Sequence, residues 1–201
     1  MPLKKILKTA LSTTYFWKIT EPLEVLLQNS GQEAKNDYLK YKSLIHQKQF
    51  LAKNLLLDYL SLQDQIYYLP SGKPVLKDGG FVSVSHSQNW VAVALSDIPL
   101  GIDIETARPK LLKIASKFVC NNDCQLLDCQ SVNQLQFLWT AKESIYKLMG
   151  EKGLVFKELC LSKIDLERKL AEILLPDARK ISLFFNTIED NFIICQAFFD
   201  K

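Results

Sequence analysis

Leu-Gly-Ile-Asp-Ile-Glu, residues 100–105, is the stretch on which the interpretation of the whole sequence depends. The alternation of apolar and acidic residues predicts a short buried strand, with Ile102 and Ile104 on one face. Asp103 and Glu105 then share the opposite face. Two carboxylates placed in this way are about 7 Å apart along the strand, so they can bind one hard cation.

Phe137 to Lys147, Phe-Leu-Trp-Thr-Ala-Lys-Glu-Ser-Ile-Tyr-Lys, is predicted to lie in a helix that spans residues 134–149 and ends at Gly150. Glu143 and Lys147 stand one turn apart, away from the apolar stripe. A third carboxylate and a lysine would complete a magnesium and phosphate site. Each piece taken alone also fits a buried strand that ends in solvated acids, beside an ordinary Glu–Lys pair. The other motifs therefore have to decide between these interpretations.

Composition restricts the class of protein. The chain has 201 residues, of which 48% are hydrophobic and 23% charged, as in a globular protein with a sizeable core. A net charge of +3 is too small to indicate a nucleic-acid partner and mildly favours an acidic one. No stretch approaches the ~20 apolar residues that a membrane span needs. We expect a cytoplasmic protein with no membrane partner.

The five cysteines do not form a metal-binding pattern. Cys120, Cys124 and Cys129 lie in helical sequence with no histidine nearby, and Cys160 and Cys195 lie in strand-like runs. A zinc site would use tighter pairs or a mixture of cysteine and histidine. We therefore expect buried, reduced thiols.

The order of the predicted elements repeats. Each half contains a long helical stretch, then a short strand and then a hairpin, which predicts an α+β fold. The halves would be residues 1–98 and 99–201, so the acidic strand would open the second half, where the two meet. The first half contains a strand over 15–19, helical sequence over 32–63 that forms either two helices or one long helix with a bend near 47–49, a strand over 66–69 and a hairpin from 81–85 and 90–95. The second half contains short helices over 110–119 and 123–129, the helix over 134–149, a strand over 158–161 and a hairpin from 181–186 and 191–199.

Two further motifs carry groups that bind phosphate. Gly72-Lys73-Pro74 is a turn that presents a lysine, and Ser85-His86-Ser87 ends a predicted strand with two hydroxyls and an imidazole. Each is also common in ordinary turns and hairpins. A serine hydrolase does not fit, because the adjacent strand residues Ser85 and His86 point apart.

In combination these motifs resemble the 4′-phosphopantetheinyl transferase superfamily, in particular the two-lobed type that activates surfactin-type peptide synthetases. The resemblance runs from about Phe50 to Leu161. It implies two pseudo-symmetric α+β lobes with the active site between them, and no need for a second copy of the chain, so we expect a monomer. The motifs that carry it are Gly72-Lys73-Pro74, Ser85-His86-Ser87, Gly101-Ile102-Asp103-Ile104-Glu105 and Trp139-Thr140-Ala141-Lys142-Glu143-Ser144-x-x-Lys147.

The resemblance implies a reaction and its participants. Such enzymes transfer the 4′-phosphopantetheine arm of coenzyme A to a serine of an apo acyl or peptidyl carrier protein. Asp103, Glu105 and Glu143 would bind Mg²⁺ with the diphosphate. Glu143 would also accept the serine proton, and Lys147 would steady the α-phosphate. Phosphoryl transfer needs neutralised oxygens and a positioned nucleophile, so these are suitable groups.

The resemblance also implies a nucleotide site. Lys73, Ser85 and His86 would hold the nucleotide, with Lys142 near a phosphate. The family usually has an arginine in the first-lobe helix, where Lys48 is the available substitute. It also commonly has a glutamate after the segment Lys117-Phe118-Val119, where Asp123 is the nearest acid.

Two other functions use similar residues. A Mg²⁺-dependent nuclease also places acids and a lysine around a metal, but it follows a nucleic-acid backbone with a basic groove, and this chain has little net charge. A non-catalytic module could bind coenzyme A or a carrier protein. The presence of Asp103, Glu105, Glu143 and Lys147 together favours the enzyme.

Overall fold

The structure is a computed structural model that describes residues 3–151 and 153–200. The chain divides into two compact units, residues 1–69 with 74–97 and residues 70–73 with 98–201. The loop of residues 70–73 therefore groups with the second unit, whereas the predicted boundary had placed it in the first.

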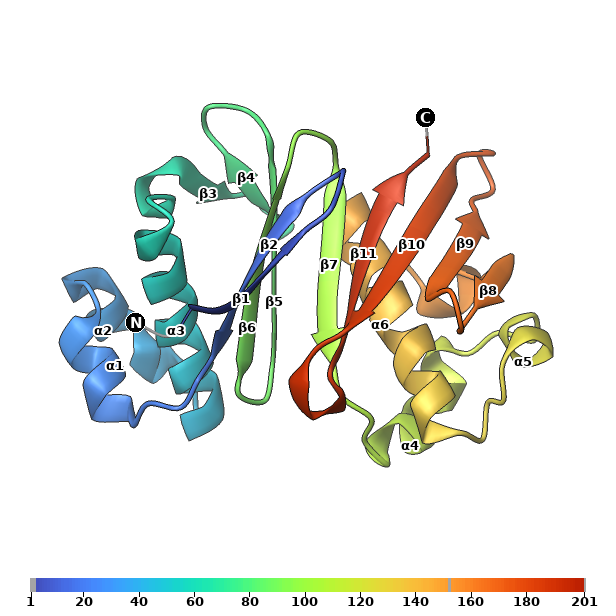
Figure 1. Ribbon diagram of the computed structural model, residues 1–201, viewed down its shortest axis with the longest axis horizontal. Coiled ribbons are helices and arrows are strands. Elements are labelled where there is room, and N and C mark those ends of the chain that lie inside the picture. The colour runs from blue at the N-terminus through green and yellow to red at the C-terminus, as the bar shows by residue number, and fades with distance from the viewer. Residues whose placement is uncertain (1–2, 152, 201) are drawn as a thin grey trace. The chain divides into compact units, whose positions relative to one another are not determined.

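The first unit is a four-stranded antiparallel sheet packed against helices, with strand order β1-β2-β6-β5 (Figure 1). The apolar side of α3 supplies much of its core, including Leu51, Ala52 and Leu56, all fully buried. Its elements are β1 (Leu3–Lys8), β2 (Thr13–Lys18), α1 (Leu23–Asn29), α2 (Gln32–Asp37), α3 (Leu44–Tyr59), β3 (Ile66–Tyr68), β4 (Pro74–Leu76), β5 (Phe81–Ser87) and β6 (Trp90–Ser96).

The second unit is a five-stranded sheet with α6 lying across it (Figure 1). The strand order is β7-β11-β10-β9-β8, and adjacent strands are antiparallel. Helix α6 begins after Ser131, whose hydroxyl caps it, and ends at Gly150 in the left-handed conformation. The elements are β7 (Leu100–Glu105), α4 (Lys110–Phe118), α5 (Asp123–Leu126), α6 (Val132–Met149), β8 (Lys163–Asp165), β9 (Leu170–Leu174), β10 (Lys180–Thr187) and β11 (Ile193–Phe199).

The two units repeat one order of elements, although β3 and β4 form a separate two-stranded sheet whereas β8 and β9 join the sheet of β7, β11 and β10. In the first, β2 is followed by helices, two short strands and the hairpin β5–β6, and β6 pairs with β2. In the second, β7 is followed by helices, two short strands and the hairpin β10–β11, and β11 pairs with β7. This confirms the α+β class predicted from the order of elements.

Several predicted elements were wrong in detail. The helical stretch 32–63 forms two helices, α2 and α3, which confirms one of the two predicted alternatives; the break lies at residues 41–43, where Ser43 caps α3, and α3 does not bend near 47–49. Residues 158–161 are not a strand, because a short 3-10 turn over Phe156–Glu158 precedes β8. Strands β1, β4, β8 and β9 were missed; Lys4 and Lys5 interrupt the apolar pattern of β1, and β4 and β8 have only three residues each.

In the described part of the chain, no helix is long enough and apolar enough to span a membrane. A cytoplasmic location stays a prediction.

Candidate active site

Strand β7 carries the two acids as its alternation predicts. Ile102 and Ile104 are fully buried, and Asp103, whose partner on β11 is Cys195, is 5% exposed. Glu105, at the end of the strand, is partly exposed and pairs with Arg108 at 2.5 Å. Asp103 and Glu105 therefore lie on the same strand face, but Asp103 is buried and Glu105 is partly exposed to solvent.

Gly101 lets α6 approach β7 closely. A Cβ at this position would collide with the carbonyl oxygen of Ser144 and the backbone nitrogen of Leu148. The glycine thus removes the one side chain that would separate helix from strand, and the backbone of α6 lies directly over β7. This packing brings Glu143 and Lys147 to the strand that carries Asp103.

Lys147 and Asp103 form an ion pair between α6 and β7. The lysine Nζ lies 2.8 Å from Asp103 Oδ1, and the two side chains are 26% and 7% exposed. In such a half-buried position the attraction is stronger than at the surface, because water screens it less. The predicted clamp and one predicted metal ligand are therefore direct neighbours.

The pKa of Glu143 is raised well above its ordinary value. Burial, followed by the negative charge of Asp103, raises the pKa of Glu143 to about 7, and Glu105 adds to the rise while Lys147 opposes it. The charges of Asp103 and Glu105 on β7 thus act on Glu143 on α6. A site of this kind favours a bound cation, since a cation would offset their mutual repulsion.

Within residues 3–151 and 153–200, no three histidine, cysteine or carboxylate side chains are close enough together to hold a metal ion. Instead, the Lys147 ammonium lies on Asp103 and Arg108 pairs with Glu105. The carboxylate oxygens have the chemistry that a hard cation prefers, so the residue types fit Mg²⁺. The three-acid ligand set stays a prediction.

The comparisons with known proteins agree on one family. Residues 99–197 match the profile of the 4′-phosphopantetheinyl transferase superfamily. The chain is 30% identical over 154 residues to the 4′-phosphopantetheinyl transferase psf-1 of Bacillus pumilus, covering 69% of this chain and 65% of that protein. It is 32% identical over 118 residues to gsp of Aneurinibacillus migulanus (55% and 49%) and 38% identical over 89 residues to Sfp of Bacillus subtilis strain 168 (41% and 39%).

Over its second unit, this chain is similar to the 4′-phosphopantetheinyl transferase superfamily. The matched stretch spans less than two thirds of the length of each of these relatives. The superfamily match covers the second unit from before β7 into β11, and so includes Asp103, Glu143 and Lys147.

The predicted nucleotide residues lie in both units. Ser85 and His86 are neighbours on β5, where Ser85 is buried and His86 exposed, so they face opposite sides as the strand period requires. Lys48 is half-buried on α3. Lys73 donates to the carbonyl oxygen of Leu148 at 2.5 Å, near the end of α6, and burial lowers its pKa. Their contact with a nucleotide stays a prediction.

The expectation that Lys142 lies near a phosphate was wrong. Its side chain is 0% exposed, and its ammonium lies 2.6 Å from Asp123 Oδ2. Asp123 is also fully buried, so it is neither a nucleotide ligand nor a candidate base. The motif spacing predicted the place of Lys142 on α6 but not the direction of its side chain.

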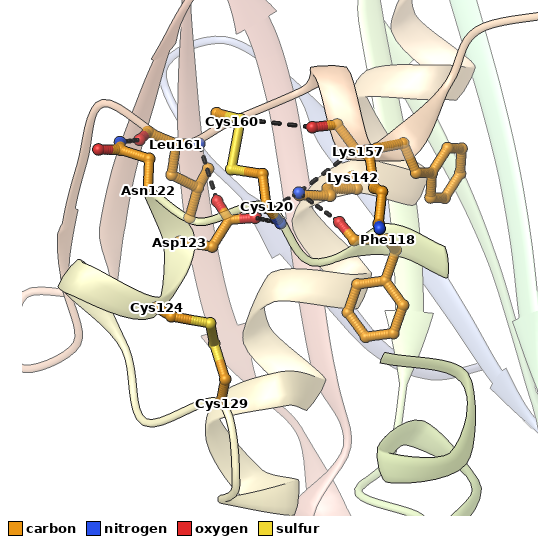
Figure 2. The surroundings of a disulfide bond; sticks show 11 residues. Phe118, Cys120, Asn122, Asp123, Cys124, Cys129, Lys142, Lys157, Cys160 and Leu161 are labelled. Carbon is orange, nitrogen blue, oxygen red and sulfur yellow. Dashed lines mark hydrogen bonds and ion pairs between the residues drawn. A yellow bond between two sulfur atoms is a disulfide. The ribbon is translucent and has the colours of Figure 1, made fainter. Parts of the chain in front are cut away.

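The expectation of reduced cysteines was wrong for four of the five. Cys120 pairs with Cys160, and Cys124 pairs with Cys129 (Figure 2). Cys195, opposite Asp103 on β11, is a buried free thiol, and burial raises its pKa. The error arose because the 40-residue separation of Cys120 and Cys160 gives no local signal.

Sequence reasoning missed Gln136, which holds the end of the acidic strand. Its side-chain amide nitrogen donates to the backbone oxygen of Glu105 at 2.8 Å and to that of Asn191 at 3.2 Å, and the residue is 3% exposed. Gln136 precedes Glu143 by seven residues and so shares its face of α6. That spacing was the available signal.

Proposed function

We propose that this protein transfers the 4′-phosphopantetheine group of coenzyme A to a serine of an apo acyl or peptidyl carrier protein, and that the reaction depends on Mg²⁺. The observation that carries the proposal is the arrangement of Asp103, Glu143 and Lys147 where α6 crosses β7. Similarity to the family supports it, since the relatives psf-1, gsp and Sfp are named 4′-phosphopantetheinyl transferases.

In this reaction the serine oxygen attacks the phosphorus that carries the pantetheine. The bond from that phosphorus to the bridging oxygen breaks, and adenosine 3′,5′-bisphosphate leaves. Glu143 accepts the serine proton, directly or through water; beside a bound cation its carboxylate would stay ionised and so able to accept a proton. Lys147 donates to the oxygens of the leaving α-phosphate, where negative charge develops.

Asp103, Glu105 and Glu143 are the residues proposed to hold Mg²⁺. The ion would neutralise the diphosphate oxygens. Two observations support this assignment: Asp103 and Glu105 share one strand face, and their charges raise the pKa of Glu143. When substrate and ion bind, Lys147 would exchange Asp103 for a phosphate oxygen; its side chain is 26% exposed.

The test is a mass measurement on apo-carrier proteins of fatty acid, polyketide and peptide synthases. Each is incubated with the protein, coenzyme A and Mg²⁺, and we expect one or more carriers to gain the mass of one phosphopantetheine. A carrier whose acceptor serine is replaced by alanine is the control. If no carrier gains mass while the protein nicks plasmid DNA with Mg²⁺, the activity is that of a nuclease. If coenzyme A binds without transfer and regardless of Mg²⁺, the protein is a binding module.

A further inference from the structure

Lys142 lies in a complete cage of acceptors inside the second unit. Its ammonium donates to the backbone oxygen of Phe118 at 2.6 Å, to Asp123 Oδ2 at 2.6 Å and to the backbone oxygen of Phe156 at 3.2 Å. An ammonium has three N–H donors, and these three partners use them all. The cage therefore fixes the end of this side chain in three directions.

Asp123 is satisfied in the same way. Oδ2 also accepts from the backbone nitrogen of Cys120 at 2.9 Å, and Oδ1 accepts from that of Leu161 at 3.1 Å (Figure 2). The carboxylate thus joins the segment after α4 to the segment before β8. The disulfide between Cys120 and Cys160 joins the same two segments. Lys142 is anchored to a part of the fold that is itself cross-linked.

The place of this anchor on α6 is significant. Lys142 directly precedes Glu143, so their side chains leave the helix about 100° apart. The helix is held separately against the sheet, where Gly101 admits its backbone and the Ser144 hydroxyl donates to the backbone oxygen of Cys195 at 3.1 Å. Contacts to the sheet set how close α6 lies. A tether from another direction restrains its rotation about its own axis.

A buried ion pair is not a good way to gain stability, because desolvation of both charges offsets their attraction. Directional hydrogen bonds do restrict geometry. A side chain ends about 5 Å from the helix axis, so a rotation of about 10° moves that end by about 1 Å. A displacement of about 1 Å at a reacting group can reduce the rate by ~10²-fold.

We propose that Lys142 and Asp123 are positioning residues, which fix the rotation of α6 so that Glu143 and Lys147 face Asp103. The inference rests on the proposed transfer function for its kinetic consequence, but the orientation of the helix can be measured without it. Neither residue touches a substrate in this proposal.

The principal variant removes both charges at once, as Asp123→Asn with Lys142→Met. Neither charge is then left buried without its partner, so we expect the double variant to fold, with a lower melting temperature because some buried backbone groups lose a hydrogen-bond partner. We expect turnover to fall between ~10- and ~100-fold with an unchanged KM for the carrier. Calorimetric titration of Mg²⁺ in the presence of coenzyme A should show weaker binding, and a crystal structure should show α6 rotated relative to β7, β11 and β10.

The matched control removes an exposed ion pair from the same unit, as Asp177→Asn with Arg179→Met, whose side chains are 52% and 50% exposed. It should leave turnover, Mg²⁺ binding and helix orientation unchanged. If the principal variant does not fold, Lys142→Gln replaces it, since the amide keeps a donor toward Asp123, and the same measurements apply.

An α6 that keeps its orientation in the crystal overturns the inference whatever the activity. So does a folded variant with the turnover and Mg²⁺ affinity of the unaltered protein, because the pair would then be structural only. If the unaltered protein transfers nothing, the proposed function fails by itself, and the orientation of α6 still decides the inference.

Discussion

Glu143 and Lys147 stand one turn apart on α6, yet the proposed reaction gives them different tasks. Glu143→Gln keeps the shape and removes the proton acceptor, so we expect turnover to fall by ~10²–10⁴-fold. Lys147→Ala should also lower turnover but leave the pH at which activity rises unchanged. The measurement is the pH profile of both variants at saturating substrates. If the Gln variant keeps the turnover and the acid limb of the unaltered enzyme, the base lies elsewhere.

The raised pKa of Glu143 also predicts how the stability of the metal-free protein depends on pH. The folded value is about 7 and the ordinary value is 4.5, so the folded state binds more protons between these limits. Stability is therefore full below about pH 4.5 and is lost as the pH rises through 7. In EDTA at pH 8, Glu143→Gln should exceed the unaltered protein in free energy of unfolding by up to about 3 kcal/mol.

Urea unfolding at pH 4.5 and pH 8 tests this, with the exposed Glu158→Gln as control. The two proteins should be equally stable at the lower pH. An equal difference at both values would mean that the substitution acts through packing and not through charge.

His86 tests the nucleotide site on the first unit. Its imidazole is exposed on β5 and is proposed to contact a phosphate of coenzyme A. Loss of a hydrogen bond to a charged group costs ~1.5–3 kcal/mol, so His86→Ala should weaken the binding of coenzyme A more than it slows saturated turnover. Calorimetry with coenzyme A and its 3′-dephospho form gives the measurement. An unchanged preference between the two ligands would remove His86 from phosphate recognition.

At the level of elements, the site depends on the contact between α6 and β7. Gly101→Ala places a methyl group against the backbone of Ser144 and Leu148, which cannot move aside as a flexible side chain can. We expect a loss of ~1–3 kcal/mol in the free energy of unfolding, together with reduced turnover. Gly31→Ala is the control, because a Cβ there meets nothing within 4 Å. Equal stability of the two variants would show that α6 has room to shift.

At the level of the whole molecule, two disulfides cross-link segments of the second unit that lie outside its β-sheet. Cys120 and Cys160 are 40 residues apart, so in the chain-entropy account Cys120→Ser with Cys160→Ser should cost up to about 4 kcal/mol. The shorter Cys124–Cys129 loop, with a separation of five, should contribute about 2 kcal/mol. Urea unfolding with and without reductant tests both values. A protein whose stability is indifferent to reductant would contradict the pairing.

Local sequence was sufficient wherever periodicity or a single residue determines the conformation. The alternation of residues 100–105 predicted the acidic strand, and the spacing of Glu143 and Lys147 predicted their shared side of α6. Gly150 predicted the end of that helix. The order of elements predicted the α+β class. These features depend on residues within a few positions of one another, so a single sequence contains them.

The tertiary structure alone decided where long side chains end and which cysteines meet. Lys142 turns inward because Asp123, 19 residues earlier, is buried beside it, and no local pattern records that partner. Cys120 meets Cys160 because the segment after α4 lies beside the segment before β8. Short strands such as β8 form because a neighbouring strand supplies hydrogen bonds, not because their own sequence demands it. Contacts between distant segments depend on packing of the whole unit, which periodicity does not contain.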